Sequence, residues 1–257
     1  MSEHQWVTTD IDARGVATVT MRNAAKLNAL SISVQNALIA AMAAISASEA
    51  VRVVILRGEG ERAFVGGADL RELAALNSST AAAFITGVHR TCHAMRTCPV
   101  PVIARIQGHA LGAGLELAVA CDMRVASDDS MLGMPEVKIG VPSVVEAALL
   151  PQLIGWGRTR QLLLTGENIS ATTAAAWGLV EQVVPAADLD AAVERLVGPI
   201  VASGPQAVRL QKELIRQWEN LPTSDAVQAG IACFARAFET DEPTRMLGHA
   251  LERMRKK

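Results

Sequence analysis

The sequence contains few aromatic residues, and this shortage excludes one class of protein. Aromatic side chains make up 3% of the 257 residues, and tyrosine is absent. Proteins that bind single-stranded nucleic acid stack the bases on such rings and follow the backbone with basic grooves. The formal net charge of -2 offers no broad basic surface. We therefore expect neither nucleic acid nor an anionic membrane as a partner.

Cysteines and long apolar runs are also scarce. The four cysteines, at positions 92, 98, 121 and 233, have irregular spacings without a C-x-x-C pair, so we expect reduced thiols and neither a disulfide framework nor a metal site. No run of 18 apolar residues predicts a membrane span, and residues 1–10 are too polar for a signal peptide. These features predict a cytoplasmic protein.

What is present indicates one large α/β unit. Half of the residues are hydrophobic and 19% are charged, which is typical of a globular chain with a substantial core. Four β-rich runs alternate with helical patterns, at residues 16–21, 51–56, 100–106 and 123–126. This alternation predicts a mostly parallel sheet with helical crossovers. After residue 144 only residues 180–184 resemble a strand, and we place a boundary near residue 190, between an α/β core (1–190) and an all-helical region (191–257).

One charged residue stands where a charge is costly. Glu116 is the only charged side chain in the apolar residues 110–121, and a buried carboxylate is unfavourable unless it is paired or protonated. The structural explanation is that Glu116 acts as a cap or pairs with a basic residue such as Arg124. The catalytic explanation starts from Gly112 and Gly114, which allow close backbone approach before a helix whose first N–H groups are free to hold an oxyanion.

A second glycine-rich turn, at residues 66–70, also joins an expected strand to an expected helix. Alone it is an ordinary connection. Two such turns in one parallel sheet would meet at the carboxyl ends of the strands, where ligands bind in α/β folds. Glu136 lies on a turn that contains Pro135, and by itself it is weak evidence because exposed loop glutamates are common.

Other catalytic motifs are missing or incomplete. The chain has no P-loop and no G-x-S-x-G elbow, and Leu117 occupies the third glycine position of a dinucleotide fingerprint. His89 and His93 have the spacing of a zinc-protease helix but lack its glutamate. We expect these two histidines to be a pair on a helix surface.

Residues 103–126, which read Ile-Ala-Arg-Ile-Gln-Gly-His-Ala-Leu-Gly-Ala-Gly-Leu-Glu-Leu-Ala-Val-Ala-Cys-Asp-Met-Arg-Val-Ala, resemble the signature of the enoyl-coenzyme A hydratase/isomerase (crotonase) family. The similarity covers nearly the whole chain and continues at residues 23–30, 62–73, 132–136, 177–180 and 183–185. It implies a crotonase-like spiral core of repeated ββα units with a C-terminal all-helical trimerisation region. It also implies an acyl-CoA thioester substrate, no cofactor beyond that coenzyme A, and a homotrimer or dimer of trimers.

The resemblance also implies the roles of site residues. The backbone N–H groups of Ala68 and Ala113 would form an oxyanion hole, each donor supplying about 3 kcal/mol. Ala113 stands where the family often has glycine. A backbone donor tolerates alanine at this position if φ stays negative. Glu116 would activate water and Glu136 would protonate the α-carbon. The residues expected to bind substrate or coenzyme A are Lys26, Gly66, Ala68, Asp69, Leu70, Gly112 and Ala113.

Because both glutamates are present, the resemblance implies an enoyl-CoA hydratase, which adds water across the 2,3 double bond through an enolate. One alternative is an isomerase or acyl-CoA hydrolase of the same fold, since these enzymes frequently lack one of the glutamates. A less favoured alternative is a non-catalytic homologue that binds a partner or RNA, which would need a hidden basic stripe.

The segment after Glu136 departs from the hydratase pattern Gly-x-x-Pro-Gly-x-Gly-Gly-Thr, because residues 140–148 read Gly-Val-Pro-Ser-Val-Val-Glu-Ala-Ala, one residue shorter. Ser143 and Glu146 have the spacing of a capping box ahead of an apolar helix, and this is the role we expect for them. The alternative is a third carboxylate in the pocket, which would favour a double-bond shift or thioester hydrolysis. The candidates for an acyl tunnel are Leu76, Met95, Met131, Met134 and Trp156.

Overall fold

The computed structural model describes residues 6–255, and its core contains two sheets. The larger sheet has the order β1-β2-β3-β5-β7-β10. Its first pair is antiparallel and the other neighbours are parallel, as the alternating strand and helix patterns predict. Its strands are β1 (Val7–Ile11), β2 (Val16–Met21), β3 (Val53–Gly58), β5 (Val102–Ile106), β7 (Met123–Ser127) and β10 (Gln182–Val184).

The smaller sheet has the order β4-β6-β8-β9, with β4, β6 and β8 parallel and β9 antiparallel. Its strands are β4 (Ala63–Val65), β6 (His109–Leu111), β8 (Met131–Gly133) and β9 (Ile169–Ser170). Strands of the two sheets alternate along the chain, so β3 is followed by β4, β5 by β6 and β7 by β8, with helical segments between the pairs. This arrangement is the ββα spiral that the resemblance implies.

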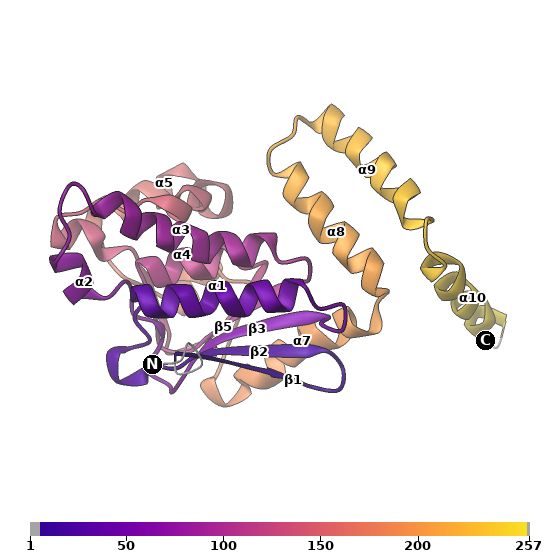
Figure 1. The fold of residues 1–257 in the computed structure, drawn as a ribbon, viewed down its shortest axis with the longest axis horizontal. Helices are drawn as coiled ribbons and strands as arrows, with labels where there is room; N and C mark the ends of the chain where they lie inside the picture. Colours follow the sequence, from indigo (N-terminus) through magenta and orange to yellow (C-terminus); the bar gives the residue numbers. More distant parts are fainter. Residues whose placement is uncertain (1–5, 256–257) are drawn as a thin grey trace.

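Helices α1 (Ile32–Ser46) and α3 (Ala81–Thr97) lie side by side over one face of the larger sheet (Figure 1). Ser31 caps α1 by accepting the Val34 N–H, which satisfies one of the free donors at the start of a helix. Each helix buries one apolar stripe, which includes Leu38 and Met42 in α1 and Val88 in α3. The short helix α4 (Ala113–Val119) is buried along its whole length.

Helix α7 (Leu189–Ala202) belongs to a separate apolar cluster with strand residues of the larger sheet, among them Val16, Val53 and Ile103. The division into a core of residues 1–190 and a helical region of 191–257 stays a prediction, because α7 begins at this boundary and packs on the sheet. The remaining segments are η2 (Ala24–Lys26), α2 (Leu70–Ala74), η3 (Pro135–Ile139), η4 (Val145–Leu149), α5 (Leu150–Thr165), α6 (Ala171–Trp177) and η5 (Ala186–Asp188).

The last three helices, α8 (Pro205–Trp218), α9 (Thr223–Ala237) and α10 (Glu242–Arg255), extend away from the core (Figure 1). Many of their large apolar side chains are exposed, which is unusual for a monomer. Those more than half exposed are Val227, Ile231, Phe234, Phe238, Leu247, Leu251 and Met254. Within residues 6–255, no helix has both the length and the hydropathy needed to cross a membrane.

Candidate active site

The two glycine-rich turns come together at the carboxyl ends of the neighbouring parallel strands β4 and β6. Gly67 has a φ of +118° and Gly112 a φ of +52°, values that residues with a side chain seldom adopt. Gly114 is needed for close packing, because a Cβ there would lie 2.2 Å from the Val65 carbonyl oxygen. The turns therefore meet as predicted, although in the smaller sheet that the sequence did not indicate.

The N–H groups of Ala68 and Ala113 follow these turns, and both residues line one cavity of about 480 Å³. Ala113 is the first residue of α4, so its N–H has no acceptor within the helix. It is not among the residues with positive φ, which meets the condition stated for its role as a donor. Asp69 then caps α2 by accepting the N–H groups of Arg71 and Glu72.

The walls of the cavity are mostly apolar and come from α2, the start of α3, η3 and the segment that follows η3. Of the five acyl-tunnel candidates, only Leu76 belongs to this wall. Met95 and Met134 are fully buried in the core, and Trp156 is 64% exposed. Met95 and Met134 are therefore simple core residues, which is the more common role of such side chains, and Trp156 is a surface residue. Met131 lies on β8, outside the wall.

Glu116 enters the cavity from α4 and is 3% exposed. Its Oε1 accepts the backbone N–H of Ala147 at 3.2 Å. Burial and then repulsion by Glu136 raise the pKa of Glu116 to about 8, while the Ala147 hydrogen bond opposes the shift. The predicted pairing of Glu116 with Arg124 is wrong, because Arg124 instead binds Glu181 at 2.5 Å.

Glu136 enters the same cavity from η3 and is half-buried. Its Oε2 accepts the Ser143 hydroxyl at 2.8 Å. Burial raises the pKa of Glu136, and the Ser143 hydrogen bond opposes this shift. Its Oε1 lies so close to Gly112 that a Cβ at that position would be 2.4 Å away. The two glutamates and the glycine-rich turn at residues 112–114 thus form one site.

The capping-box prediction for Ser143 and Glu146 is wrong. The N-cap of η4 is Val144, without a side-chain hydrogen bond, and Ser143 binds Glu136. Val145 has a φ of +39°, so the chain does not follow the path of a capping box, and Glu146 is 3% exposed.

His89 and His93 form the expected pair on a helix surface, since both are exposed on α3, and His89 Nδ1 also lies 2.9 Å from Glu146 Oε1. His93 is exposed, and its ring centroid lies 5.6 Å from that of His89. Sequence reasoning missed the contact of His89 with Glu146 because it joins residues on two separate elements.

Lys26 and Asp69 form an ion pair at 3.5 Å, and neither lines the cavity. Their contact with coenzyme A stays a prediction, as does the expectation that no metal takes part. Within residues 6–255, no group of three or more His, Cys, Asp or Glu side chains is placed to hold a metal ion.

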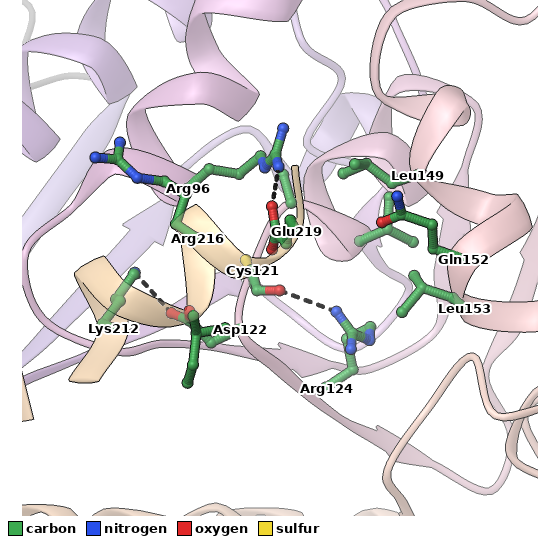
Figure 2. Close-up of a pocket in the computed structure, with 13 residues that line it drawn as sticks. Arg96, Cys121, Asp122, Arg124, Leu149, Gln152, Leu153, Lys212, Arg216 and Glu219 are labelled. Carbon is green, nitrogen blue, oxygen red and sulfur yellow. Dashed lines mark hydrogen bonds and ion pairs between the residues drawn. The ribbon is translucent and has the colours of Figure 1, made fainter. Parts of the chain in front are cut away.

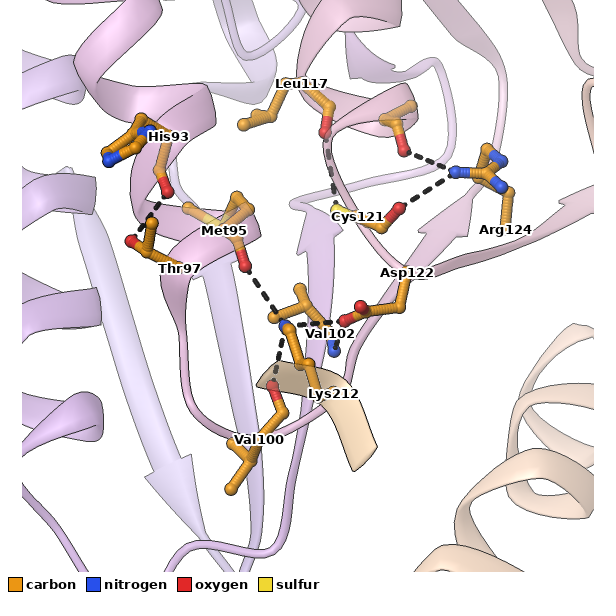
Figure 3. A network of polar contacts seen from close by, with 11 residues as sticks. His93, Met95, Thr97, Val100, Val102, Leu117, Cys121, Asp122, Arg124 and Lys212 are labelled. Atoms are coloured by element: carbon orange, nitrogen blue, oxygen red, sulfur yellow. Dashed lines mark hydrogen bonds and ion pairs between the residues drawn. The ribbon is translucent and has the colours of Figure 1, made fainter. Parts of the chain in front are cut away.

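A second, polar cavity of about 150 Å³ contains none of the predicted site residues (Figure 2). Four of the residues that line it form two ion pairs, Arg96 with Glu219 and Lys212 with Asp122. Lys212 is 8% exposed, and its Nζ also donates to two backbone carbonyls, those of Met95 and Val100 (Figure 3). These contacts attach α8 to the core, so we assign this cavity a structural role.

Comparison with known proteins gives consistent matches. The sequence profile of the enoyl-CoA hydratase/isomerase family matches residues 12–255. The chain is 33% identical over 228 residues to the short-chain-enoyl-CoA hydratase of Clostridium acetobutylicum, covering 88% of this chain and 87% of that one. It is 34% identical over 217 residues to the crotonyl-CoA hydratase of Syntrophomonas wolfei, covering 83% and 82%. A crystal structure of an enoyl-CoA hydratase from Bacillus anthracis, 33% identical, superposes with a TM-score of 0.93 over 97% of each chain.

Proposed function

Because the chain belongs to the enoyl-CoA hydratase/isomerase family, we propose that it is an enoyl-CoA hydratase, which adds water across the 2,3 double bond of an enoyl-CoA thioester. One observation carries the proposal. Glu116 and Glu136 line the same cavity as Ala68 and Ala113, the residues whose N–H groups follow the two glycine-rich turns. An acid, a base and a pair of oxyanion donors are what hydration of an activated double bond requires.

The two backbone donors act on the thioester oxygen. Attack of water on the β-carbon moves negative charge onto this oxygen as the enolate forms. Fixed N–H groups stabilise that charge without reorganising, and each contributes about 3 kcal/mol in comparable sites. Gly112 and Gly114 allow this arrangement because a side chain at either position would collide with Glu136 or Val65.

The two glutamates supply the proton chemistry. Burial raises the pKa of both carboxyls, that of Glu116 to about 8, so the two groups titrate as a coupled pair. One of them takes a proton from water and the other protonates the α-carbon, and the resemblance implies that Glu116 activates the water. One proton is taken and one is given, and the pair is restored when the proton returns to its first position.

The apolar wall supports an aliphatic acyl chain as the substrate group. A neighbouring hollow of about 370 Å³ shares Leu70, Leu73 and Ile139 with the main cavity, which gives room for chains longer than crotonyl. Lys138 also lines the main cavity, but its ammonium group is paired with Glu167 at 2.7 Å. A carboxylate on the acyl chain would therefore gain little there.

We also propose that the protein is a cytoplasmic homotrimer or dimer of trimers that uses no cofactor beyond the coenzyme A of its substrate. Support for the oligomer comes from the exposed apolar side chains of α9 and α10, such as Phe234 and Leu251. Contact with another copy would bury them. Light scattering of the purified protein measures this assembly directly.

The test is the loss of enoyl absorbance with crotonyl-CoA and with a ten-carbon enoyl-CoA, with the product identified by its mass. We expect a gain of one water. Glu116→Gln and Glu136→Gln should each lower kcat by about 100-fold to 10,000-fold, while Glu239→Gln, at an exposed position after α9, should leave it unchanged. Release of free thiol would instead indicate a hydrolase, and a product of unchanged mass an isomerase.

A further inference from the structure

The loop that joins β2 to α1, residues 23–30, carries out no step of the proposed reaction, yet its backbone is strained. Leu27 has a φ of +55° and Asn28 a φ of +53°. A left-handed conformation costs free energy in any residue with a side chain, and two in succession persist only where their surroundings enforce them. Because such strain is concentrated at functional sites, this loop calls for a functional explanation.

The strained loop lies against the glycine-rich turn that precedes α2. The Leu27 carbonyl accepts the Gly66 N–H at 2.8 Å. The Gly67 carbonyl accepts the Leu30 N–H, also at 2.8 Å. Because a peptide group is planar and trans, fixing the Gly67 carbonyl also fixes the Ala68 N–H, which belongs to the same peptide group and points away from Leu30. The loop therefore sets the direction of one of the two proposed oxyanion donors.

The other proposed donor is held in a different way. It belongs to the peptide group between Gly112 and Ala113. The carbonyl of this group accepts the N–H groups of Leu115 and Glu116 at 2.8 and 3.0 Å, so the first turn of α4 fixes it. The Ala68 N–H lies before α2 begins and is fixed from the loop instead. A change in the loop should therefore displace one donor and leave the other in place.

The side chain of Asn28 holds the loop. It is 1% exposed, and its Nδ2 donates to the Glu59 carbonyl at 3.0 Å and to the Ala63 carbonyl at 2.8 Å. Its Oδ1 accepts the Asn23 N–H at 3.0 Å, so both amide donors and the acceptor are used. Gly58 makes room for this amide, because a Cβ there would lie 2.5 Å from Nδ2. Since Ala63 begins β4, the strand that leads into the turn, the amide ties the loop to that strand.

We propose that Asn28 is a positioning residue for the oxyanion hole, which acts through the loop and the Gly67 carbonyl to hold the Ala68 N–H against the thioester oxygen. The kinetic part of this proposal rests on the proposed hydratase function. The part that concerns a bound thioester requires only that its oxygen lie between the two donors, whether or not water is added.

The decisive measurement is the carbonyl stretching frequency of bound hexanoyl-CoA, labelled with 13C at the thioester carbon. This saturated thioester cannot be hydrated, and hydrogen bonds to its oxygen lower the frequency. We expect the wild type to lower it on binding. Asn28→Gly keeps the left-handed backbone accessible and removes only the side-chain hydrogen bonds. It should reduce the lowering by about half, because one of two donors is displaced.

A second variant keeps the test valid if Asn28→Gly does not fold. Asn28→Asp retains an acceptor for the Asn23 N–H and tolerates the left-handed conformation, but it loses the amide donors to the Glu59 and Ala63 carbonyls. It should reduce the lowering of the frequency in the same way. The matched control is Lys212→Met, which also removes a buried polar side chain with three hydrogen bonds. This control should leave the frequency at its wild-type value.

The same variants are then compared by kcat and KM for hydration of crotonyl-CoA. Negative charge on the thioester oxygen grows as the enolate forms, so a displaced donor acts mainly on the transition state. Both Asn28 variants should lower kcat by about 10-fold to 100-fold, and KM should change by less than about threefold. The limbs of the pH–rate profile should stay in place, because no titrating group has been changed.

Two results would overturn the proposal. One is a wild-type frequency in a folded Asn28 variant, or an equal change in Lys212→Met. The other is a wild-type protein that binds no hexanoyl-CoA or binds it without lowering the frequency. If the wild type lowers the frequency but hydrates no enoyl-CoA, the proposed function fails, while the frequency in the Asn28 variants still decides whether this residue positions the donor.

Discussion

Replacing Gly112 with alanine should disable the site through Glu136. Gly112 has a φ of +52°, and an added Cβ would lie 2.4 Å from Glu136 Oε1 and 3.2 Å from its Cδ. Ordinary contact begins at 3.4 Å, so the carboxylate must retreat by about 1 Å. It cannot do so freely, because Ser143 holds its other oxygen at 2.8 Å and Pro135 begins the short helix that carries it.

A displacement of 1 Å at a catalytic group lowers the rate by about 100-fold in comparable sites. Alanine at a glycine-only backbone conformation also costs about 1–3 kcal/mol of stability. Gly155→Ala separates these effects, because Gly155 has a φ of +76° and a Cβ there would meet nothing within 4 Å. Both variants should be less stable than the wild type, and only Gly112→Ala should lose kcat.

The assay is kcat and KM for crotonyl-CoA at a temperature where circular dichroism shows both variants to be folded. Gly112→Ala should lose kcat by about 100-fold relative to Gly155→Ala. Because the loss acts through Glu136, adding Glu136→Gln to Gly112→Ala should cost much less than it costs the wild type. A kcat for Gly112→Ala within twofold of the Gly155→Ala value would refute the reasoning.

Three further predictions follow from buried polar groups. The pKa of Glu116 is about 8 in the folded protein against a usual 4.5, so the stability that the protonated Glu116 contributes is lost as the pH rises from 4.5 to 8. Glu116→Gln should therefore have a higher melting temperature than the wild type at pH 8.5. The difference in melting temperature should vanish near pH 4.5. Ser143→Ala removes a donor from Glu136 and should lower kcat by about 10-fold, with the limb of the pH–rate profile that Glu136 sets at higher pH, because this hydrogen bond lowers the pKa of Glu136. Lys212→Met leaves Asp122 unpaired and should cost about 2–4 kcal/mol in urea unfolding, with kcat of the folded protein unchanged.

The larger elements of the fold were predictable because they carry long periodic patterns. Strand β2 buries about every second residue, and helix α1 buries about every third or fourth residue. Such patterns can be recognised in a sequence. Strands β4, β6 and β8 have three residues each, which is too short to show any period. The two glycine-rich turns nevertheless follow these short strands. The meeting of the turns was therefore predicted correctly, whereas the smaller sheet that brings them together was not predicted.

The candidate site was predictable only in part, for a related reason. Glu116 was visible as a charge in an apolar segment, and Glu136 through the family resemblance. The contact of His89 with Glu146 joins residues 57 positions apart and depends on a positive φ at Val145. Local preferences argue against that conformation for a valine. The sequence therefore favoured an unstrained capping box, and tertiary packing overrode it.

The way α4 is fixed explains why the site can be both strained and well ordered. Its first turn is held by Gly114, which packs directly against Val65, and its last turn by Arg124, which donates to the Ala118 and Cys121 carbonyls. Ala113 and Glu116 lie within one turn of this short helix, so the proposed oxyanion donor and the carboxyl of Glu116 keep a fixed separation.

Glu136 is carried by a separate element and depends on Ser143 and Gly112 for its position. Changes that shift α4 should therefore weaken both oxyanion binding and proton transfer. Changes around η3 should affect only the proton transfer at Glu136, and they should lower kcat while leaving KM nearly unchanged.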